Sequence, residues 1–234
     1  MKERLRRIRN LLLWLALASW KPRKPVLLYL GVNAGESFDR LFRDYRRCIG
    51  FEADPDLARK LQRRYRRHRH VTIVNAAAAD RDGETEFHIA DNGGRSSSLG
   101  RINPACPDTE GVAMTRTVRV KTVNLHDYCA AHKIDSITDY VSDIQGMDLA
   151  VLTTMRPFID RGAIGSITCE VSRDDRPEGY LDAPRNNMAG FSALLSARYL
   201  LTASGWGTLL TDGSFHEFPP ACWYMDCRWR LRAP

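Results

Sequence analysis

The sequence predicts an α/β fold in which a mostly parallel sheet is flanked by helices. Apolar runs of strand length alternate with segments of helical periodicity, and this alternation is typical of βαβ units with right-handed crossovers. The first of these runs is continuously apolar, as expected for a parallel strand that is buried on both faces. Polar residues follow several strands directly, and open α/β sheets bind ligands at the carboxyl ends of their strands.

In the first half of the chain, we expect three strands separated by helices. The expected elements are a strand at 26–30, a glycine turn at 31–35, a helix at 36–47, a strand at 48–51, a helix from Pro55 and a strand at 71–74. Residues 85–90 and 117–123 then alternate like antiparallel strands. They predict a hairpin-like insertion near 84–123.

The α/β alternation resumes in the second half. The expected elements are a helix at 125–132, a strand at 140–144, a helix at 148–160, a strand at 165–171, a helix at 191–204 and strands at 208–210 and 223–230. The segment SSSL at 96–99 and a loop at 172–190 are expected to flank the ligand-binding edge. Polar loops at such an edge often determine which substrate is accepted.

Composition indicates one ordinary globular domain. The chain has 234 residues, of which 44% are hydrophobic and 9% aromatic, and these fractions exclude global disorder. Its six cysteines include no C-x-x-C pair, which argues against a disulfide framework or a structural zinc site. The histidines form no ligand set either, so we expect no bound metal, and we expect a reducing, cytoplasmic setting.

The net charge of +7 lies entirely in residues 1–24, which contain eight basic residues and one acidic residue. The remaining 27 basic and 27 acidic residues cancel. We therefore divide the chain into a basic N-terminal tail at 1–24 and a neutral domain at 25–234. A neutral domain does not indicate a nucleic-acid partner.

Within the tail, the apolar segment LLLWLALASW at 11–20 lies between basic flanks. Ten helical residues span about 15 Å, which is roughly half of the hydrocarbon thickness of a membrane. Three alternatives remain: a signal peptide, an interfacial helix that holds the protein on anionic lipid, and a helix that packs on the domain or on a second subunit. The second would make the protein a peripheral membrane protein, and the third would allow an oligomer.

The turn GVNAG contains the first candidate ligand contacts, Gly31, Asn33 and Gly35. Glycines at a strand-to-helix turn let the backbone approach a ligand, and the first turn of the helix offers unpaired N–H groups. Glu52 ends the second strand about twenty residues later, where an acid accepts hydrogen bonds from ribose hydroxyls. The turn lacks the G-x-G-x-x-G pattern of NAD-dependent oxidoreductases. Because this enzyme class shares the glycine turn and the acid, we keep it as an alternative function.

Further acids follow the later strands. Asp80 follows the third strand, with the small residues Ala78 and Ala79 before it, and Asp143 and Glu170 end the next two. All are expected at one edge of the sheet, because the carboxyl ends of parallel strands meet there. The alternative for Asp143 and Glu170 is a purely structural role as paired, buried acids.

Several motifs follow one another along the chain in a fixed order: VLLYLGVNAGES, IGFEADP, VNAAAADRDGETEFHI, SSSL, VKTVNLHDY and DYVSDIQGMDLAVL. With these motifs in this order, the chain resembles the FkbM family of S-adenosylmethionine-dependent methyltransferases. The resemblance extends from about Val26 to Glu170, and more loosely to the C-terminus through GWGTLL and DCRWR. It implies a class I methyltransferase fold with a Rossmann-like sheet. It also implies methylation of a hydroxyl on a sugar, a glycan or another small metabolite.

The resemblance also implies residue roles. The implied cofactor contacts are, from the methionine part through the ribose to the adenine, Gly31, Asn33, Gly35, Glu52, Ala78, Ala79 and Asp80. Asp143, Gly146 and Asp148 match the family signature D-x-E-G-x-E. Glu170 matches the acid that ends the next strand.

Four positions depart from the family pattern. Tyr29 replaces a common aspartate, Ser142 replaces a common lysine, and Gln145 and Asp148 replace glutamates. The departures at Tyr29, Ser142 and Gln145 favour an alternative in which a weakened, methyltransferase-like domain binds a membrane or a protein partner.

Methyl transfer to a hydroxyl requires the acceptor oxygen to be positioned and its proton to be removed. Asp143 is the first candidate for the general base, or for orienting the acceptor, and Glu170 is the second.

Overall fold

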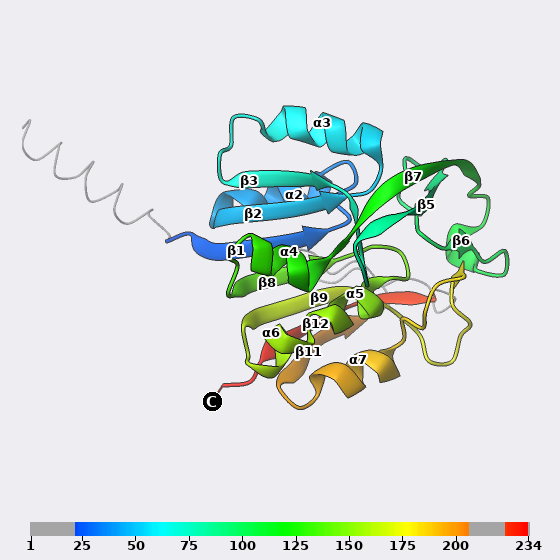
Figure 1. Cartoon of the computed structure of the whole chain (residues 1–234). Coiled ribbons are helices and arrows are strands. Elements are labelled where there is room, and N and C mark those ends of the chain that lie inside the picture. The colour runs from blue at the N-terminus through cyan, green and yellow to red at the C-terminus, as the bar shows by residue number, and fades with distance from the viewer. Residues whose placement is uncertain (1–21, 206–222, 234) are drawn as a thin grey trace, which may run out of the picture.

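A seven-stranded sheet forms the centre of the molecule, in the order β11-β12-β9-β8-β1-β2-β3 (Figure 1). The structure is a computed structural model and describes residues 22–205 and 223–233. The strands are β1 (Lys24–Leu30), β2 (Tyr45–Glu52), β3 (Val71–Asn75), β8 (Ile137–Ser142), β9 (Ile164–Ser172), β11 (Tyr199–Gly205) and β12 (Tyr224–Leu231). Only β12 runs antiparallel to its neighbours, β9 and β11. The predicted mostly parallel sheet is confirmed, and β1 lies in its interior between β8 and β2.

Helices cover both faces of this sheet, and alternate residues of β1 pack against opposite layers. Leu27 and Tyr29 pack in a core with residues of α2 (Glu36–Leu41), η1 (Phe42–Asp44) and α3 (Pro55–Tyr65). Leu28 and Leu30 lie in the larger core on the other face. The helices on that face are α4 (Leu125–Ala131), α5 (Asp148–Thr154), α6 (Arg156–Asp160) and α7 (Met188–Leu195).

The insertion forms a second, three-stranded sheet in the order β4-β7-β5. Its strands are β4 (Ala77–Ala79), β5 (Gly83–Ala90) and β7 (Met114–Asn124). β5 and β7 are antiparallel, which confirms the predicted hairpin. The loop between them contains η2 (Pro107–Thr109) and β6 (Arg101–Ile102), which pairs with β10 (Tyr180–Leu181). This sheet lies beside the carboxyl ends of the central strands (Figure 1).

Two predicted helices are shorter than expected. The helix predicted at 36–47 ends at Leu41, and β2 begins at Tyr45, because Tyr45 and Arg47 pair in register with Lys24 and Val26 of β1. The helix predicted at 148–160 is divided into α5 and α6 around Met155. Pro157 causes this break, since proline lacks an N–H donor and its ring clashes with the preceding turn.

The helix predicted at 191–204 is wrong in its second half. α7 ends at Leu195, and residues from Tyr199 form β11, which pairs with β12 across the sheet. The pairing partner lies more than twenty residues later, so long-range pairing overrides the local helical pattern. The strand predicted at 208–210 lies outside the described residues.

Residues 1–21 also lie outside the described part of the chain, so the alternatives for the tail stay predictions. Lys24, counted with the tail by its charge, begins β1 and forms an ion pair with Asp139 at 3.1 Å. Among the described residues, no helix is both long and apolar enough to cross a membrane.

Candidate active site

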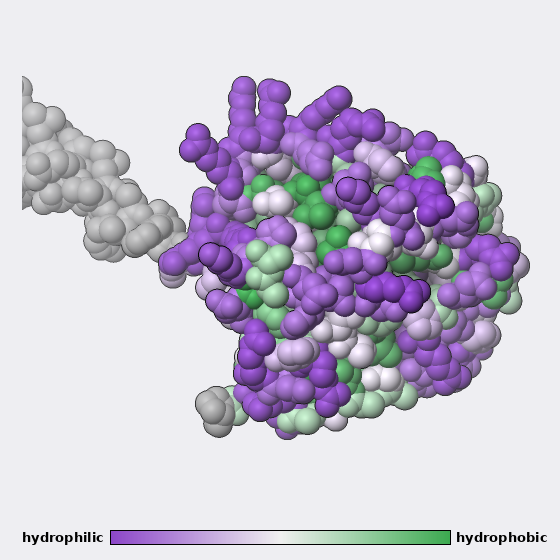
Figure 2. Space-filling view, in the orientation of Figure 1, coloured by the Kyte–Doolittle hydropathy of each residue, from purple (hydrophilic) through white to green (hydrophobic). Residues whose placement is uncertain are grey.

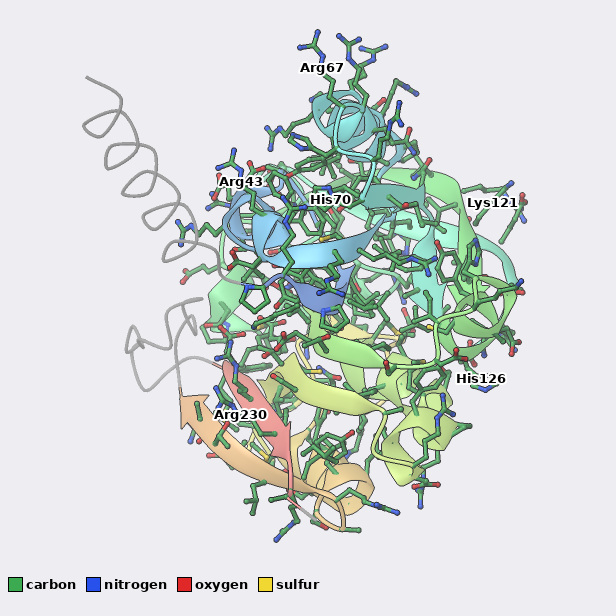
Figure 3. The ribbon with its side chains drawn as sticks, turned by 90° about the vertical axis from the view of Figure 1, so that its left-hand side faces the viewer. Arg43, Arg67, His70, Lys121, His126 and Arg230 are labelled. Atoms are coloured by element: carbon green, nitrogen blue, oxygen red, sulfur yellow. The ribbon has the colours of Figure 1, made fainter. Side chains whose placement is uncertain are left out.

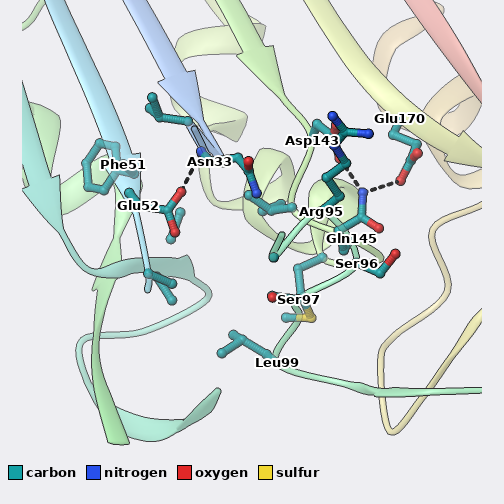
Figure 4. A pocket seen from close by; sticks show the side chains of 18 of the residues that line it. Asn33, Phe51, Glu52, Arg95, Ser96, Ser97, Leu99, Asp143, Gln145 and Glu170 are labelled. Carbon is teal, nitrogen blue, oxygen red and sulfur yellow. Dashed lines mark hydrogen bonds between the residues drawn. The ribbon is translucent and has the colours of Figure 1, made fainter. Parts of the chain in front are cut away.

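A cavity of about 670 Å³ opens at the carboxyl ends of β1, β2, β8 and β9. Its size lies within the range of small-molecule and cofactor sites. Beyond these strand ends, its walls include β4, β5, the segment 94–99, the loop that carries Tyr180 and the first residues of β12 (Figure 4). The predicted ligand-binding edge of the sheet is therefore the position of a cavity large enough for a cofactor.

The glycine turn packs closely against the loop after β8. Gly31 has a φ of +77°, and a Cβ at this position would lie 1.9 Å from the carbonyl oxygen of Asp143. The N–H groups of Gly31 and Val32 both donate to the carbonyl oxygen of Phe51. Only glycine fits here, and its backbone joins the ends of β1, β2 and β8.

Glu52 is buried at the end of β2 and contacts the glycine turn. Its Oε2 accepts a hydrogen bond of 2.6 Å from the N–H of Asn33, and its Oε1 accepts one of 2.8 Å from the N–H of Asp54. Burial raises the pKa of Glu52 from 4.5 to about 7, although the backbone donors act in the opposite direction. A carboxylate has about four acceptor sites, so Glu52 retains acceptor capacity for two ribose hydroxyls.

Small and apolar residues form the wall next to Glu52. Ala76, Ala77 and Ala78 line the cavity, and Phe87 and Leu99 lie on the side of the second sheet. This wall has the chemistry that a flat, weakly polar ring such as adenine requires.

Two of the predicted cofactor residues lie elsewhere. Ala79 is buried within β4 and does not line the cavity. Asp80 also lies outside the cavity, and its side chain is 62% exposed to solvent. The cause is that β4 pairs with β7 of the second sheet rather than extending the central sheet. The sequence predicted Asp80 at the carboxyl edge of the central sheet, and this prediction is wrong.

Asp143 and Glu170 lie together in the cavity, and Gln145 links them. The amide nitrogen of Gln145 donates to Asp143 Oδ1 and, at 3.2 Å, to Glu170 Oε2 (Figure 4). The side-chain amide oxygen Oε1 of Gln145 accepts a hydrogen bond from the hydroxyl of Tyr180. Gln145 itself has a φ of +54° and is followed by Gly146 at +95°, so a left-handed turn aims its amide at both acids.

Both acids have raised pKa values. Burial raises the pKa of Asp143, and hydrogen bonding from Gln145 opposes this shift. Burial also raises the pKa of Glu170 well above its ordinary value, and repulsion from Asp143, Asp148 and Asp226 adds to the effect. Carboxylates raised in this way accept protons more readily near neutral pH than ordinary ones.

Asp148, which matches the last acid of the family signature, is fully buried and does not line the cavity. Its Oδ1 accepts hydrogen bonds from the Ser142 hydroxyl and from the N–H of Ile144. Burial raises its pKa to about 7. The serine and the aspartate therefore form a structural pair at the end of β8, which holds the loop that carries Asp143.

Several cavity residues were not predicted. Tyr224 and Asp226 come from the first residues of β12, and Tyr180 comes from the loop predicted to flank the site. The hydroxyl of Tyr224 is buried and has no hydrogen-bond partner among the described residues. The predicted flanking segment 96–99 contributes Ser96, Ser97 and Leu99, and Arg95 before it also lines the cavity.

Comparison with known proteins identifies the family. A model of the methyltransferase FkbM domain matches residues 30–196, which is more than half of the chain. The chain belongs to the FkbM methyltransferase family. This membership confirms the predicted resemblance and the prediction of a methyltransferase that uses S-adenosylmethionine.

A curated relative is the 2-O-methyltransferase NoeI of Sinorhizobium fredii (strain NBRC 101917 / NGR234). It is 25% identical over 165 residues, which cover 67% of each chain.

Among solved structures, the N-methyltransferase NodS from Bradyrhizobium japonicum WM9 is similar with a TM-score of 0.45 and 12% identity, over 97% of this chain and 96% of that one. Fibrillarin from Aeropyrum pernix with natively bound S-adenosyl-L-methionine is similar with a TM-score of 0.46 and 11% identity, over 90% and 69% of the chains. The fold assignment rests on the strand order of this chain.

The cavity fits the cofactor of this FkbM methyltransferase. Gly31, Asn33 and Gly35 line it at the glycine turn, and Glu52 and Ala78 follow along one wall. The carboxylates of Asp143 and Glu170 and the amide of Gln145 also line it, with Asp143 next to the glycine turn. The individual binding roles of these residues stay predictions. No group of three or more histidine, cysteine or acidic side chains within the described ranges is arranged to hold a metal ion.

Proposed function

We propose that the protein transfers a methyl group from S-adenosylmethionine to a hydroxyl of a sugar, a glycan or another small metabolite. The observation that carries this proposal is the joint placement of Asp143, Gln145 and Glu170 in one cavity with the glycine turn. The curated relative is by name a 2-O-methyltransferase, which supports an oxygen acceptor.

The acceptor end of the cavity has the polar groups that hydroxyls require. Carboxylates accept hydrogen bonds from hydroxyl groups, and the tyrosine hydroxyls both donate and accept them. The carboxylates of Asp143 and Glu170 supply such partners around one volume. A polyhydroxylated acceptor would be oriented by several of these contacts at once, and orientation is the main contribution that a protein makes to a displacement reaction.

S-adenosylmethionine, when bound, supplies an electrophilic methyl group on a sulfonium centre. The chain itself must remove the proton of the acceptor hydroxyl, because a neutral alcohol is a weak nucleophile. We assign this step to Asp143, which lies directly beside the glycine turn, with Glu170 as the second acid of the pair. Gln145 is a positioning residue, since it acts by orienting both carboxylates.

The alternative of a weakened binding module is not favoured. Two of the residues that depart from the family pattern form specific hydrogen bonds in or next to the site. The Ser142 hydroxyl donates to Asp148, and the Gln145 amide donates to Asp143 and Glu170. Tyr29 is buried and packs edge-on against Phe38 at 5.6 Å. These contacts support an adapted site rather than a degraded one.

The test is transfer of a labelled methyl group from S-adenosylmethionine to matched panels of sugars and amino sugars. We expect labelled methyl ethers on sugars that lack an amino group, and loss of labelling in Asp143→Asn while S-adenosylhomocysteine still binds. If only the nitrogen of amino sugars is labelled, the acceptor is an amine and the proposed hydroxyl acceptor is wrong. If the protein binds S-adenosylhomocysteine but transfers no methyl group to any acceptor, the result supports the alternative of a binding module without turnover.

A further inference from the structure

Exposed cations are concentrated on the surface formed by residues 40–47 and the second half of α3 with the turn after it. We call this surface the basic face. Its members are Arg40, Arg43, Arg46, Lys60, Arg63, Arg66, Arg67 and Arg69. None of them forms an ion pair with another described residue, whereas Arg59 and Arg64 are paired with Asp56 and Asp39. An excess of unpaired cations on a neutral domain favours an anionic partner.

The basic face continues around the amino ends of the central strands, opposite to the cavity. Figure 3 views the molecule from this side and shows Arg67 at the top, with Arg43 and His70 below it. Figure 2 shows strongly hydrophilic side chains projecting over the region of α3. The cavity lies at the carboxyl ends of the strands, so the two sites occupy opposite edges of the sheet.

The basic N-terminal tail joins the domain at this same edge. Pro22 and Arg23 lead directly into β1, which starts at Lys24. Lys24 lies in register with Tyr45 of β2, and the N–H of Cys48 in the same strand donates a hydrogen bond of 2.7 Å to the carbonyl oxygen of His70, in the turn after α3. The point at which the tail enters the domain and the turn after α3 therefore lie at the same end of β2.

The sequence of the tail adds an apolar component that the basic face lacks. Residues 1–24 carry a net charge of +7 around the segment LLLWLALASW. A short apolar segment with basic flanks has the composition of an interfacial anchor, and adjacent cations attract anionic lipid headgroups. We propose that the basic face and the tail together dock the protein on a membrane surface rich in anionic phospholipid.

A nucleic acid is the competing anionic partner, and the aromatic residues argue against it. Single-stranded nucleic acid is bound largely by stacking of bases on exposed aromatic rings. On this surface, Phe42 and Tyr65 are buried and pack against each other at 5.3 Å between ring centroids. They leave charge as the means of attraction and offer no exposed stacking platform.

Docking through the basic face would orient the catalytic domain. Because the cavity opens at the opposite edge of the sheet, it would face away from the membrane and stay open to the aqueous phase. This proposal is independent of the methyl acceptor, since it uses none of the cavity residues.

The test is co-sedimentation of the full chain with vesicles of phosphatidylcholine, with and without phosphatidylserine. The face variant is Arg63→Gln/Arg66→Gln/Arg67→Gln. The matched control removes three exposed cations from other parts of the molecule, Lys121→Gln/Arg176→Gln/Arg185→Gln. A tail variant, Leu12→Ser/Leu13→Ser/Trp14→Ser, tests the apolar component, and binding of S-adenosylhomocysteine by each variant shows that it is folded.

We expect binding only to vesicles with phosphatidylserine, and weaker binding as salt shortens the screening length. The face variant should bind these vesicles about a hundredfold more weakly, because each of its three lost cations contributes about fivefold to the affinity. The affinity of the control variant should not change. The tail variant should also bind more weakly.

Three outcomes would overturn the proposal. The first is an unaltered chain that does not bind anionic vesicles. The second is a face variant that binds anionic vesicles as well as the control variant does. The basic face would then be an ordinary solvated surface with no role in membrane binding. The third is a face variant that loses affinity for poly(U) RNA but not for vesicles, which would make this surface a nucleic-acid site.

Discussion

The side-chain amide of Gln145 donates a hydrogen bond of 3.2 Å to the carboxylate of Glu170, a residue 25 positions later in the chain. The same nitrogen also donates to Asp143. One amide thus connects the loop after β8 with the end of β9 and keeps two acids with raised pKa values in a single cavity. We therefore expect a substitution of Gln145 to affect turnover through both acids.

Gln145→Leu should lower kcat while leaving cofactor affinity nearly unchanged. The substitution keeps much of the side-chain volume but removes hydrogen bonds to charged groups, each worth about 1.5–3 kcal/mol. We expect kcat to fall roughly tenfold to a hundredfold, since a loss of that size corresponds to one or two decades in rate. Titration with S-adenosylhomocysteine measures the affinity, and an equal loss of affinity and kcat would show a general distortion of the site instead.

Glu52→Gln should weaken binding of S-adenosylhomocysteine. Loss of a charge-assisted hydrogen bond costs about 1.5–3 kcal/mol, which corresponds to a rise in Kd of roughly tenfold to a hundredfold. Isothermal titration measures this change. Asp80→Asn is the matched control, because Asp80 lies outside the cavity. A comparable loss of affinity in Asp80→Asn would contradict the position that the structure gives this residue.

The pH dependence of kcat should identify the base. A carboxyl group is an active base only when ionised, so activity should rise with pH through the raised pKa values of the coupled pair. Glu170→Gln removes one negative charge beside Asp143, which lowers the pKa of Asp143. The acidic limb of the profile should then move to lower pH with activity retained.

Asp143→Asn should instead remove most of the activity at every pH, by a factor on the order of 10²–10⁴. Rate profiles of the two variants, measured over the same pH range, are sufficient. If Glu170→Gln abolishes turnover and Asp143→Asn only shifts the limb, Glu170 is the base and the assignment is reversed.

Gly31→Ala should destabilise the protein much more than Gly93→Ala. Both glycines have a positive φ, +77° and +75°, so both substitutions carry a conformational cost of about 1–2 kcal/mol. A Cβ on Gly93 meets no atom within 4 Å, whereas one on Gly31 lies 1.9 Å from the carbonyl oxygen of Asp143. We expect Gly31→Ala to cost more than about 4 kcal/mol, an exceptionally large loss for one substitution. Urea unfolding measures both, and equal losses would mean that the Asp143 loop moves freely away.

The central strands and the polar residues at their ends are predictable from the amino-acid sequence. Continuous apolar runs mark parallel strands, and parallel strands place their carboxyl ends at one edge, so the sequence alone brings Gly31, Glu52, Asp143 and Glu170 together. The order of several motifs identifies the family as well. These features are local, or repeat along the chain in a regular pattern, and a sequence displays such patterns directly.

The side chains that complete the cavity, in contrast, are selected by the tertiary structure. Tyr224 and Asp226 reach it because β12 runs antiparallel beside β9, which brings the start of a late strand to the ligand-binding edge. Tyr180 reaches it through its contacts with Gln145 and Ser96. Asp80 is excluded because β4 joins the second sheet. Each of these outcomes depends on which strand or loop lies next to which, and such pairings are fixed by contacts between distant residues that leave no local pattern in the sequence.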